Sequence, residues 1–175
     1  MIHIVLYHPE IPQNTGNIMR TCVAIGAHLH IIGPVPFRLD DYSLRRAGLD
    51  YIEALQWTYY PDYEAYISTH QDVQTYYITR YAKMTYADVN YTHADQDLYL
   101  MFGRESTGID HDILRDHFDH CLRIPMVAEA RSLNLSNCVA LVAYEVLRQQ
   151  DFQGLAKEEV IKGNDFLLNE KSKIS

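Results

Sequence analysis

The chain has 175 residues, of which 47% are hydrophobic, and a formal net charge of −8 at pH 7. This length suits one domain with its own core. No apolar run is long enough to cross a bilayer and the N-terminus lacks signal-peptide features, so we expect a cytoplasmic protein without a membrane partner. Three widely spaced cysteines, Cys22, Cys121 and Cys138, indicate buried free thiols rather than a disulfide framework.

The first half of the chain is predicted to alternate strands with helices. A turn with two prolines follows the first strand, and Asn14 or Thr15 is a suitable N-cap for the helix that Gly26 ends. The elements expected here are a strand at 2–7, a helix from 14 or 15 to 25, a strand at 28–32, a short helix at 41–47, a strand at 54–59 and a helix after residue 61.

The second half continues the alternation, which indicates an α/β fold with a mostly parallel sheet flanked by helices. We expect strands at 75–79, 98–102 and 121–124, helices at 109–117 and 136–149, and an irregular loop at 125–135. The last helix is apolar nearly all round, which favours burial at a two-fold subunit interface. The domain is expected to span 1–154, and residues 155–175 to form a polar C-terminal tail.

Several nucleotide-binding and metal-binding patterns are missing. No G-x-G-x-x-G follows a strand, which disfavours an ordinary dinucleotide site. Residues 103–108 have the glycine spacing of a P-loop, but Ile109 stands where the lysine must be. The nine histidines include no i,i+4 pair on a helix, and His28 and His30 share one face of a strand. We therefore expect satisfied or exposed histidines and no metal site.

Three segments carry candidate chemistry. The helix after residue 14 packs by an apolar stripe and presents Arg20 on its polar face. The strand at 98–102 ends at Gly103, which lets a ligand approach the backbone, and Glu105 is placed to accept hydrogen bonds at the N-terminus of the following helix. Taken alone, an ordinary solvent-facing arginine and a plain helix cap explain these two segments equally well.

The third segment, residues 124–137, combines apolar and small polar groups. Ile124, Met126 and Leu133 offer a surface for a planar ring, and four small polar residues follow within six positions, namely Ser132, Asn134, Ser136 and Asn137. One such residue would suffice to cap the last helix, so four beside Arg131 suggest a binding loop. The net charge disfavours a nucleic-acid partner, although eight of the fifteen basic residues lie in or near the segments singled out.

Together these segments resemble the tRNA (cytidine/uridine-2′-O)-methyltransferase family of the SPOUT superfamily, which acts on the wobble nucleotide. The resemblance runs from Ile4 to about Tyr144 and is strongest at 9–20 (PEIPQNTGNIMR), 44–51 (LRRAGLDY) and 131–137 (RSLNLSN). One departure is visible, because many family members have proline where this chain has Arg104, but Gly103, Glu105 and Gly108 around it are kept.

The resemblance implies a SPOUT-type α/β knot with a C-terminal trefoil knot, S-adenosylmethionine as cofactor, and a homodimer that acts on the tRNA anticodon stem-loop. It places Arg20 at the reaction, reaching the cofactor of the partner copy, and Asn134 beside the hydroxyl or the methionine carboxylate. It places Arg131 and Tyr144 in RNA binding. The cofactor pocket it implies consists of Ile78, Gly103, Ile124, Met126 and Ser132.

The implied function is methyl transfer from S-adenosylmethionine to the ribose 2′-OH of the nucleotide at position 34 of tRNA, a cytidine or a modified uridine. The nearest rival is a ribose methyltransferase for ribosomal RNA, since related enzymes share the three segments. Two further rivals are a non-catalytic nucleotide- or RNA-binding module and a structural interaction protein. Arg20, Glu105, Ser132 and Asn134 argue against the former, and the polar loop at 131–137 against the latter.

Overall fold

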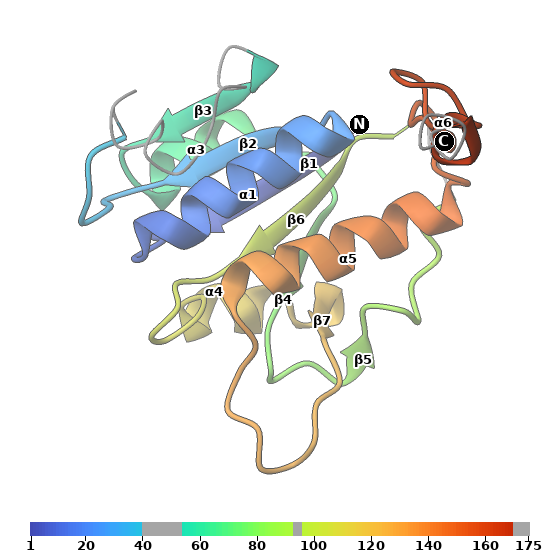
Figure 1. The fold of residues 1–175 in the computed structure, drawn as a ribbon. Helices are drawn as coiled ribbons and strands as arrows, with labels where there is room; N and C mark the ends of the chain where they lie inside the picture. The colour runs from blue at the N-terminus through green and yellow to red at the C-terminus, as the bar shows by residue number, and fades with distance from the viewer. Residues whose placement is uncertain (40–53, 93–95, 170–175) are drawn as a thin grey trace.

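The computed structural model describes residues 1–39, 54–92 and 96–169. They form a seven-stranded sheet in the order β3-β2-β1-β6-β4-β7-β5, with every paired strand parallel (Figure 1). The strands are β1 (Ile2–Tyr7), β2 (His28–Ile32), β3 (Trp57–Tyr60), β4 (Thr75–Ile78), β5 (Met84–Thr85), β6 (Leu98–Phe102) and β7 (Cys121–Arg123). The helices are α1 (Pro12–Ile25), α3 (Tyr63–Thr69), α4 (His111–Asp116), the 3₁₀ helix η2 (Phe118–His120), α5 (Leu135–Gln149) and α6 (Phe166–Asn169).

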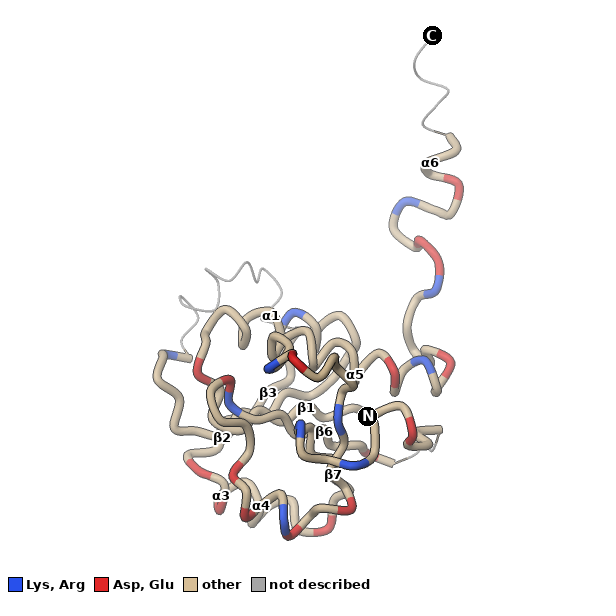
Figure 2. The backbone as a smooth tube through the Cα atoms, turned by 90° about the horizontal axis from the view of Figure 1, so that it is seen from below, with Lys and Arg blue, Asp and Glu red and all other residues tan. Residues whose placement is uncertain are grey.

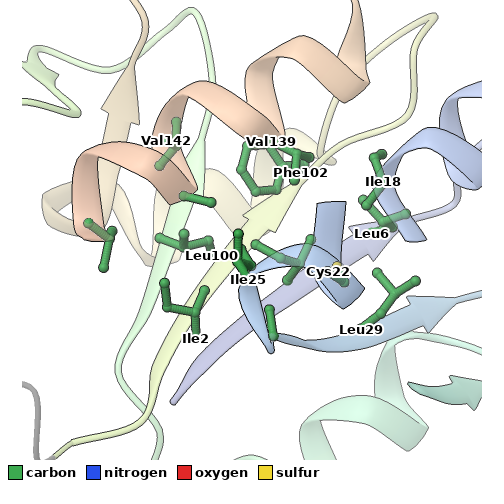
Figure 3. Close-up of a cluster of buried hydrophobic side chains, with 14 of the residues drawn as sticks. Ile2, Leu6, Ile18, Cys22, Ile25, Leu29, Leu100, Phe102, Val139 and Val142 are labelled. Carbon is green, nitrogen blue, oxygen red and sulfur yellow. The ribbon is translucent and has the colours of Figure 1, made fainter. Parts of the chain in front are cut away.

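Helices cover both faces of the sheet, as expected for parallel strands. Figure 1 shows α1 and α5 side by side on one face, with α3 and α4 on the other. In β1, Ile4 and Leu6 point to the α1 and α5 face, and Val5 and Tyr7 to the opposite face. The larger core lies under α1 and α5, where side chains of β1, β6 and both helices interlock (Figure 3).

The first helix begins earlier than predicted. Its first residue is Pro12 and its N-cap is Ile11, so the prediction of Asn14 or Thr15 as N-cap is wrong. Proline suits the first turn of a helix because its missing N–H would have no partner there. Asn14 therefore lies inside the helix, and its side-chain amide forms hydrogen bonds with other segments. The end at Gly26 is confirmed, with φ of 65° in the left-handed region.

Most other predicted boundaries agree within a few residues, but three differences stand out. The predicted strand at 54–59 is observed as Trp57–Tyr60, and the short elements β5, η2 and α6 were not predicted. The predicted helix at 41–47 lies outside the described residues. Within this single chain α5 is not buried all round, since Leu141 is 43% and Tyr144 46% exposed.

The chain after α5 leaves the domain. Leu155 still packs against the core, whereas Val160, Ile161, Leu167 and Leu168 are exposed. Figure 2 shows this segment extending away from the sheet, with α6 near its end. Within the described residues no helix combines the length and hydropathy that a membrane span requires.

Candidate active site

A cavity of about 950 Å³ opens at the carboxyl ends of three neighbouring strands. Ile78 ends β4, Gly103 follows β6, and Ile124 follows β7; all three line the cavity. The carboxyl edge of a parallel sheet is where such folds bind ligands. The volume lies within the range of cavities that hold small molecules or cofactors.

Seven of the nine residues predicted for the site line this cavity. They are Ile78, Gly103, Ile124, Met126, Arg131, Ser132 and Asn134. The other two, Arg20 on α1 and Tyr144 on α5, do not line it and are exposed on the outer side of the α1–α5 layer. One chain therefore assembles the expected pocket but keeps these two residues outside it.

The loop at 103–109 forms one wall and folds tightly on itself. A Cβ atom on Gly103 would lie 2.2 Å from the carbonyl carbon of Gly108, far inside contact distance. The Gly108 N–H donates to the Arg104 carbonyl at 2.9 Å, and Gly108 has φ of +76°. Gly103 is therefore required by the loop's own packing, and Gly108 by its backbone conformation.

Glu105 fixes this loop to the N-terminus of α1. Its carboxylate accepts hydrogen bonds from the backbone N–H groups of Glu10, at 2.8 Å, and Ile11, at 3.2 Å. In return, the Glu10 carboxylate accepts from the Ser106 N–H at 2.9 Å and from its hydroxyl at 2.8 Å. The prediction that Glu105 serves the helix following it is wrong, because these partners lie immediately before α1, about 95 residues earlier in the chain.

Asn14 links Glu105 to the third segment. It is buried, and its amide nitrogen donates to Glu105 Oε1 at 2.9 Å. Its amide oxygen accepts from the Asn134 side chain at 2.9 Å. Asn134 in turn caps α5 by accepting from the Ser136 and Asn137 N–H groups. This line of side chains joins the three sequence segments around one cavity.

Arg104, the departure from the family pattern, lies at the edge of the cavity in a polar cluster. It donates to Asp110 Oδ1 at 2.7 Å and lies over the Tyr7 ring, 5.3 Å from its centroid. The Tyr7 hydroxyl donates to Asp110 Oδ2 at 2.5 Å. Burial, reinforced by this hydrogen bond and the Asp110 charge, raises the pKa of Tyr7 to about 12. The guanidinium thus completes a local cluster that a proline could not form.

Glu10, Asn14 and Ser106 were not predicted as site residues, although they organise the site. Glu10 and Asn14 lie within one of the strongest matching motifs, at 9–20, so that motif is the signal that could have located them. Their roles depend on partners nearly a hundred residues away, which no local pattern specifies. The resulting pocket has apolar walls at Ile78 and Ile124 with polar groups at its rim. Such a lining suits a ligand with a planar ring and polar ends.

Comparison with known proteins places the chain in a family. The model of the SpoU rRNA Methylase family matches residues 1–144. An Escherichia coli (strain K12) protein named tRNA (cytidine(34)-2′-O)-methyltransferase is 44% identical over 155 residues, which cover 88% of this chain and 97% of that protein.

Two solved structures are similar over most of the chain. A Bacillus anthracis protein assigned as an RNA methyltransferase superposes with a TM-score of 0.87 at 46% identity, covering 91% of this chain and 100% of that one. A structure described in terms of 2′-OH methylation of C/U34 on tRNA has a TM-score of 0.79 at 36% identity, covering 87% and 98%. The chain belongs to the SpoU rRNA Methylase family.

Proposed function

We propose that this protein transfers the methyl group of S-adenosylmethionine to the ribose 2′-OH of nucleotide 34, the wobble position of tRNA, in the cytoplasm. The observation that carries the proposal is the meeting of three distant segments around one cavity at the carboxyl edge of the sheet. The names of similar proteins that match most of the chain support the same reaction.

The cavity fits S-adenosylmethionine in size and chemistry. Ile78, Ile124 and Met126 would contact the adenine ring, while Gly103 and Ser132 would face its polar groups and the ribose. When bound, the cofactor supplies an electrophilic methyl group on a positively charged sulfur. The chain itself then has to orient the ribose and stabilise the 2′ oxygen as its proton leaves to solvent water.

Two side chains are assigned to those tasks. A guanidinium stays protonated, so Arg20 is a poor base. Its role is to hold the phosphate next to the target ribose and to stabilise the charge that develops on the 2′ oxygen. Asn134 already uses its side chain to cap α5 and to bond Asn14, so it is held rigidly at the cavity wall. Orientation of the reacting groups as a whole can contribute about 7–11 kcal/mol to catalysis.

The active form is proposed to be a homodimer. Arg20 does not line the cavity of its own chain, so it serves a cavity only if a second copy brings it there. Leu141 and Tyr144 are large side chains exposed on α5, which lies beside α1 (Figure 1). A two-fold contact through α1 and α5 would bury these two side chains. It would also place Arg20 of each copy near the cavity of the other.

A trefoil knot at the C-terminal end of the domain is also proposed. The segment leading from β5 to β6 holds the end of α5 through Gln149, which accepts from the Tyr91 N–H at 2.9 Å and donates to the Val89 carbonyl at 3.0 Å. Gln150 donates to the Tyr91 carbonyl at 2.8 Å. These contacts support a chain end that is enclosed by earlier segments, as the family fold implies.

RNA binding is assigned to Arg131 at the cavity rim and Tyr144 on α5. The acidic net charge of −8 predicts modest affinity that falls steeply with salt. The test is to incubate the purified protein with S-adenosylmethionine and either bulk tRNA or ribosomal RNA, and to locate methyl groups by mass spectrometry of ribonuclease fragments. A 2′-O-methyl group at nucleotide 34 of tRNA supports the proposal, while methylation confined to ribosomal RNA contradicts it.

A further inference from the structure

A cluster of three histidines lies on the face of the sheet opposite α1 and α5. His3 on β1 is directly across from His28 on β2, and His30 follows two residues along on the same face. Since parallel strands share one direction, these positions near the strand starts lie toward the amino edge of the sheet, away from the cavity. The cluster is therefore separate from the methyl-transfer site.

The three rings lie close together, and the His28 ring stacks on those of His3 and His30 at interplanar angles of 21° in both cases. His3 Nδ1 and His30 Nε2 are 2.9 Å apart, and one ring nitrogen from each histidine lies within 4.8 Å of one from each of the others. Among the histidine, cysteine and carboxylate side chains of residues 1–39, 54–92 and 96–169, these three histidines are the group spaced closely enough to bind one metal ion. His3 is 8% and His30 3% exposed, while His28 is only partly buried and forms the open side.

Neighbouring oxygen atoms and one ring hold the imidazoles in place. His30 Nδ1 lies 3.0 Å from the Tyr60 hydroxyl, and a ring nitrogen of His28 lies 2.9 Å from Thr58 Oγ1. The His3 ring stacks on Tyr99 with centroids 4.1 Å apart. Metal-binding histidines are commonly oriented by such contacts to the nitrogen that does not bind the metal.

The remaining nitrogen of His3 is unsatisfied. His3 Nε2 is buried and has no hydrogen-bond partner among the described residues, although Asp97 Oδ1 lies 3.7 Å away. Leaving a buried polar atom unpaired costs free energy. A small shift of Asp97 toward this nitrogen would pair it, as happens in carboxylate–histidine–metal arrangements.

Burial is the largest cause that lowers the pKa of each of the three imidazoles, with that of His30 falling to about 3. Neighbouring imidazoles also lower the pKa of His3 and of His30, whereas Asp97 raises that of His3. A neutral ring keeps a lone pair for coordination.

We propose that His3, His28 and His30 form a binding site for one divalent transition-metal ion of the zinc class. The ligand atoms are His3 Nδ1, His30 Nε2 and a ring nitrogen of His28. Zn–N bonds of about 2.0–2.1 Å in a tetrahedral site require nitrogens about 3.3 Å apart, within the 2.9 to 4.8 Å spread observed.

Binding moves one proton but releases none. The proton now shared between His3 Nδ1 and His30 Nε2 shifts to an outward nitrogen, either His30 Nδ1 facing Tyr60 or His3 Nε2 facing Asp97. Water on the open side next to His28 completes the coordination. Because the ion ties β1 to β2 far from the cavity, its effect is on stability rather than on methyl transfer.

The test uses the full chain, stripped with a chelator and titrated with Zn²⁺ alone. We expect one ion per chain by calorimetry and elemental analysis. Free Zn²⁺ at about a hundredfold above its Kd should raise the Tm by about 5–11 °C. Co²⁺ in its place should give the visible absorption of a tetrahedral nitrogen site.

The variant His28→Ala, at the least buried ligand, should fold but lose the bound ion and the rise in Tm. The matched control His120→Ala removes an exposed histidine from η2 and should bind Zn²⁺ like the parent. His28→Gln repeats the ligand loss while keeping side-chain bulk. The proposal is overturned if the parent binds no Zn²⁺, or if His28→Ala and His28→Gln bind it as the parent does.

Discussion

Replacing Asn14 with aspartate tests the line of side chains that joins the three segments. Asn14→Asp exchanges one amide N–H donor for an oxygen, so a hydrogen bond of 2.9 Å to Glu105 becomes a contact between two carboxylates. Losing a hydrogen bond to a charged group costs about 1.5–3 kcal/mol. Repulsion at 2.9 Å adds about 1.4 kcal/mol in a water-like dielectric and more in a lower one.

The expected loss is therefore at least about 3 kcal/mol at pH 8, or a fall in Tm of about 6 °C or more. The deficit should shrink as the pH is lowered from 8 toward 5. Repulsion raises the pKa of one carboxyl of the pair above its unfolded value, so the native state binds the extra proton and its relative stability rises in acid.

Urea unfolding followed by the fluorescence of the single tryptophan, Trp57, measures both effects. The matched control is Asn17→Asp, which makes the same chemical change at an exposed position of the same helix and should alter stability by no more than about 0.5 kcal/mol. Equal losses for the two variants, or a deficit at Asn14 that does not depend on pH, would refute the reasoning.

Three further predictions concern the loop at Gly103, the role of Arg20 and the reactivity of the cysteines. Gly103→Ala should cost at least about 2 kcal/mol in a thermal melt, because its Cβ would overlap backbone at 2.2 Å; an unchanged Tm contradicts this. Arg20→Ala should slow methyl transfer by about 100-fold or more while calorimetry shows S-adenosylmethionine affinity nearly unchanged; lost cofactor binding would disprove the assignment. Burial raises the pKa of the Cys22 thiol to about 12, so iodoacetamide at pH 8 should spare it and modify the partly exposed Cys138 first, as peptide mass mapping would show.

The sheet could be predicted from the sequence because its signals are local. The strands β1, β2 and β6 are mostly buried and are followed by turn-forming residues, and all three have the predicted bounds. The pocket residues were found through a resemblance spread over most of the chain, and the carboxyl edge of the sheet brings them together.

Features that depend on long-range pairing could not be predicted. Nothing near Glu105 in sequence indicates that it bonds to the start of α1. The N-cap prediction at Asn14 failed because the helix already begins at Pro12, and the Asn14 amide has two distant partners instead. The histidine cluster was missed for the same reason. Sequence placed His28 and His30 on one strand face, but His3 joins them only through the pairing of β1 with β2.

A complementation assay tests the shared active site most directly. Arg20→Ala keeps its cavity but lacks the arginine, whereas Ser132→Trp keeps the arginine and fills the cavity at an exposed rim position. Each alone should be nearly inactive on a tRNA anticodon stem-loop. After unfolding and refolding an equal mixture, half the dimers are mixed and each has one complete site, so about a quarter of the parent activity should return as 2′-O-methylation of nucleotide 34. Activity no greater than the sum of the separate variants would contradict a site built from two copies.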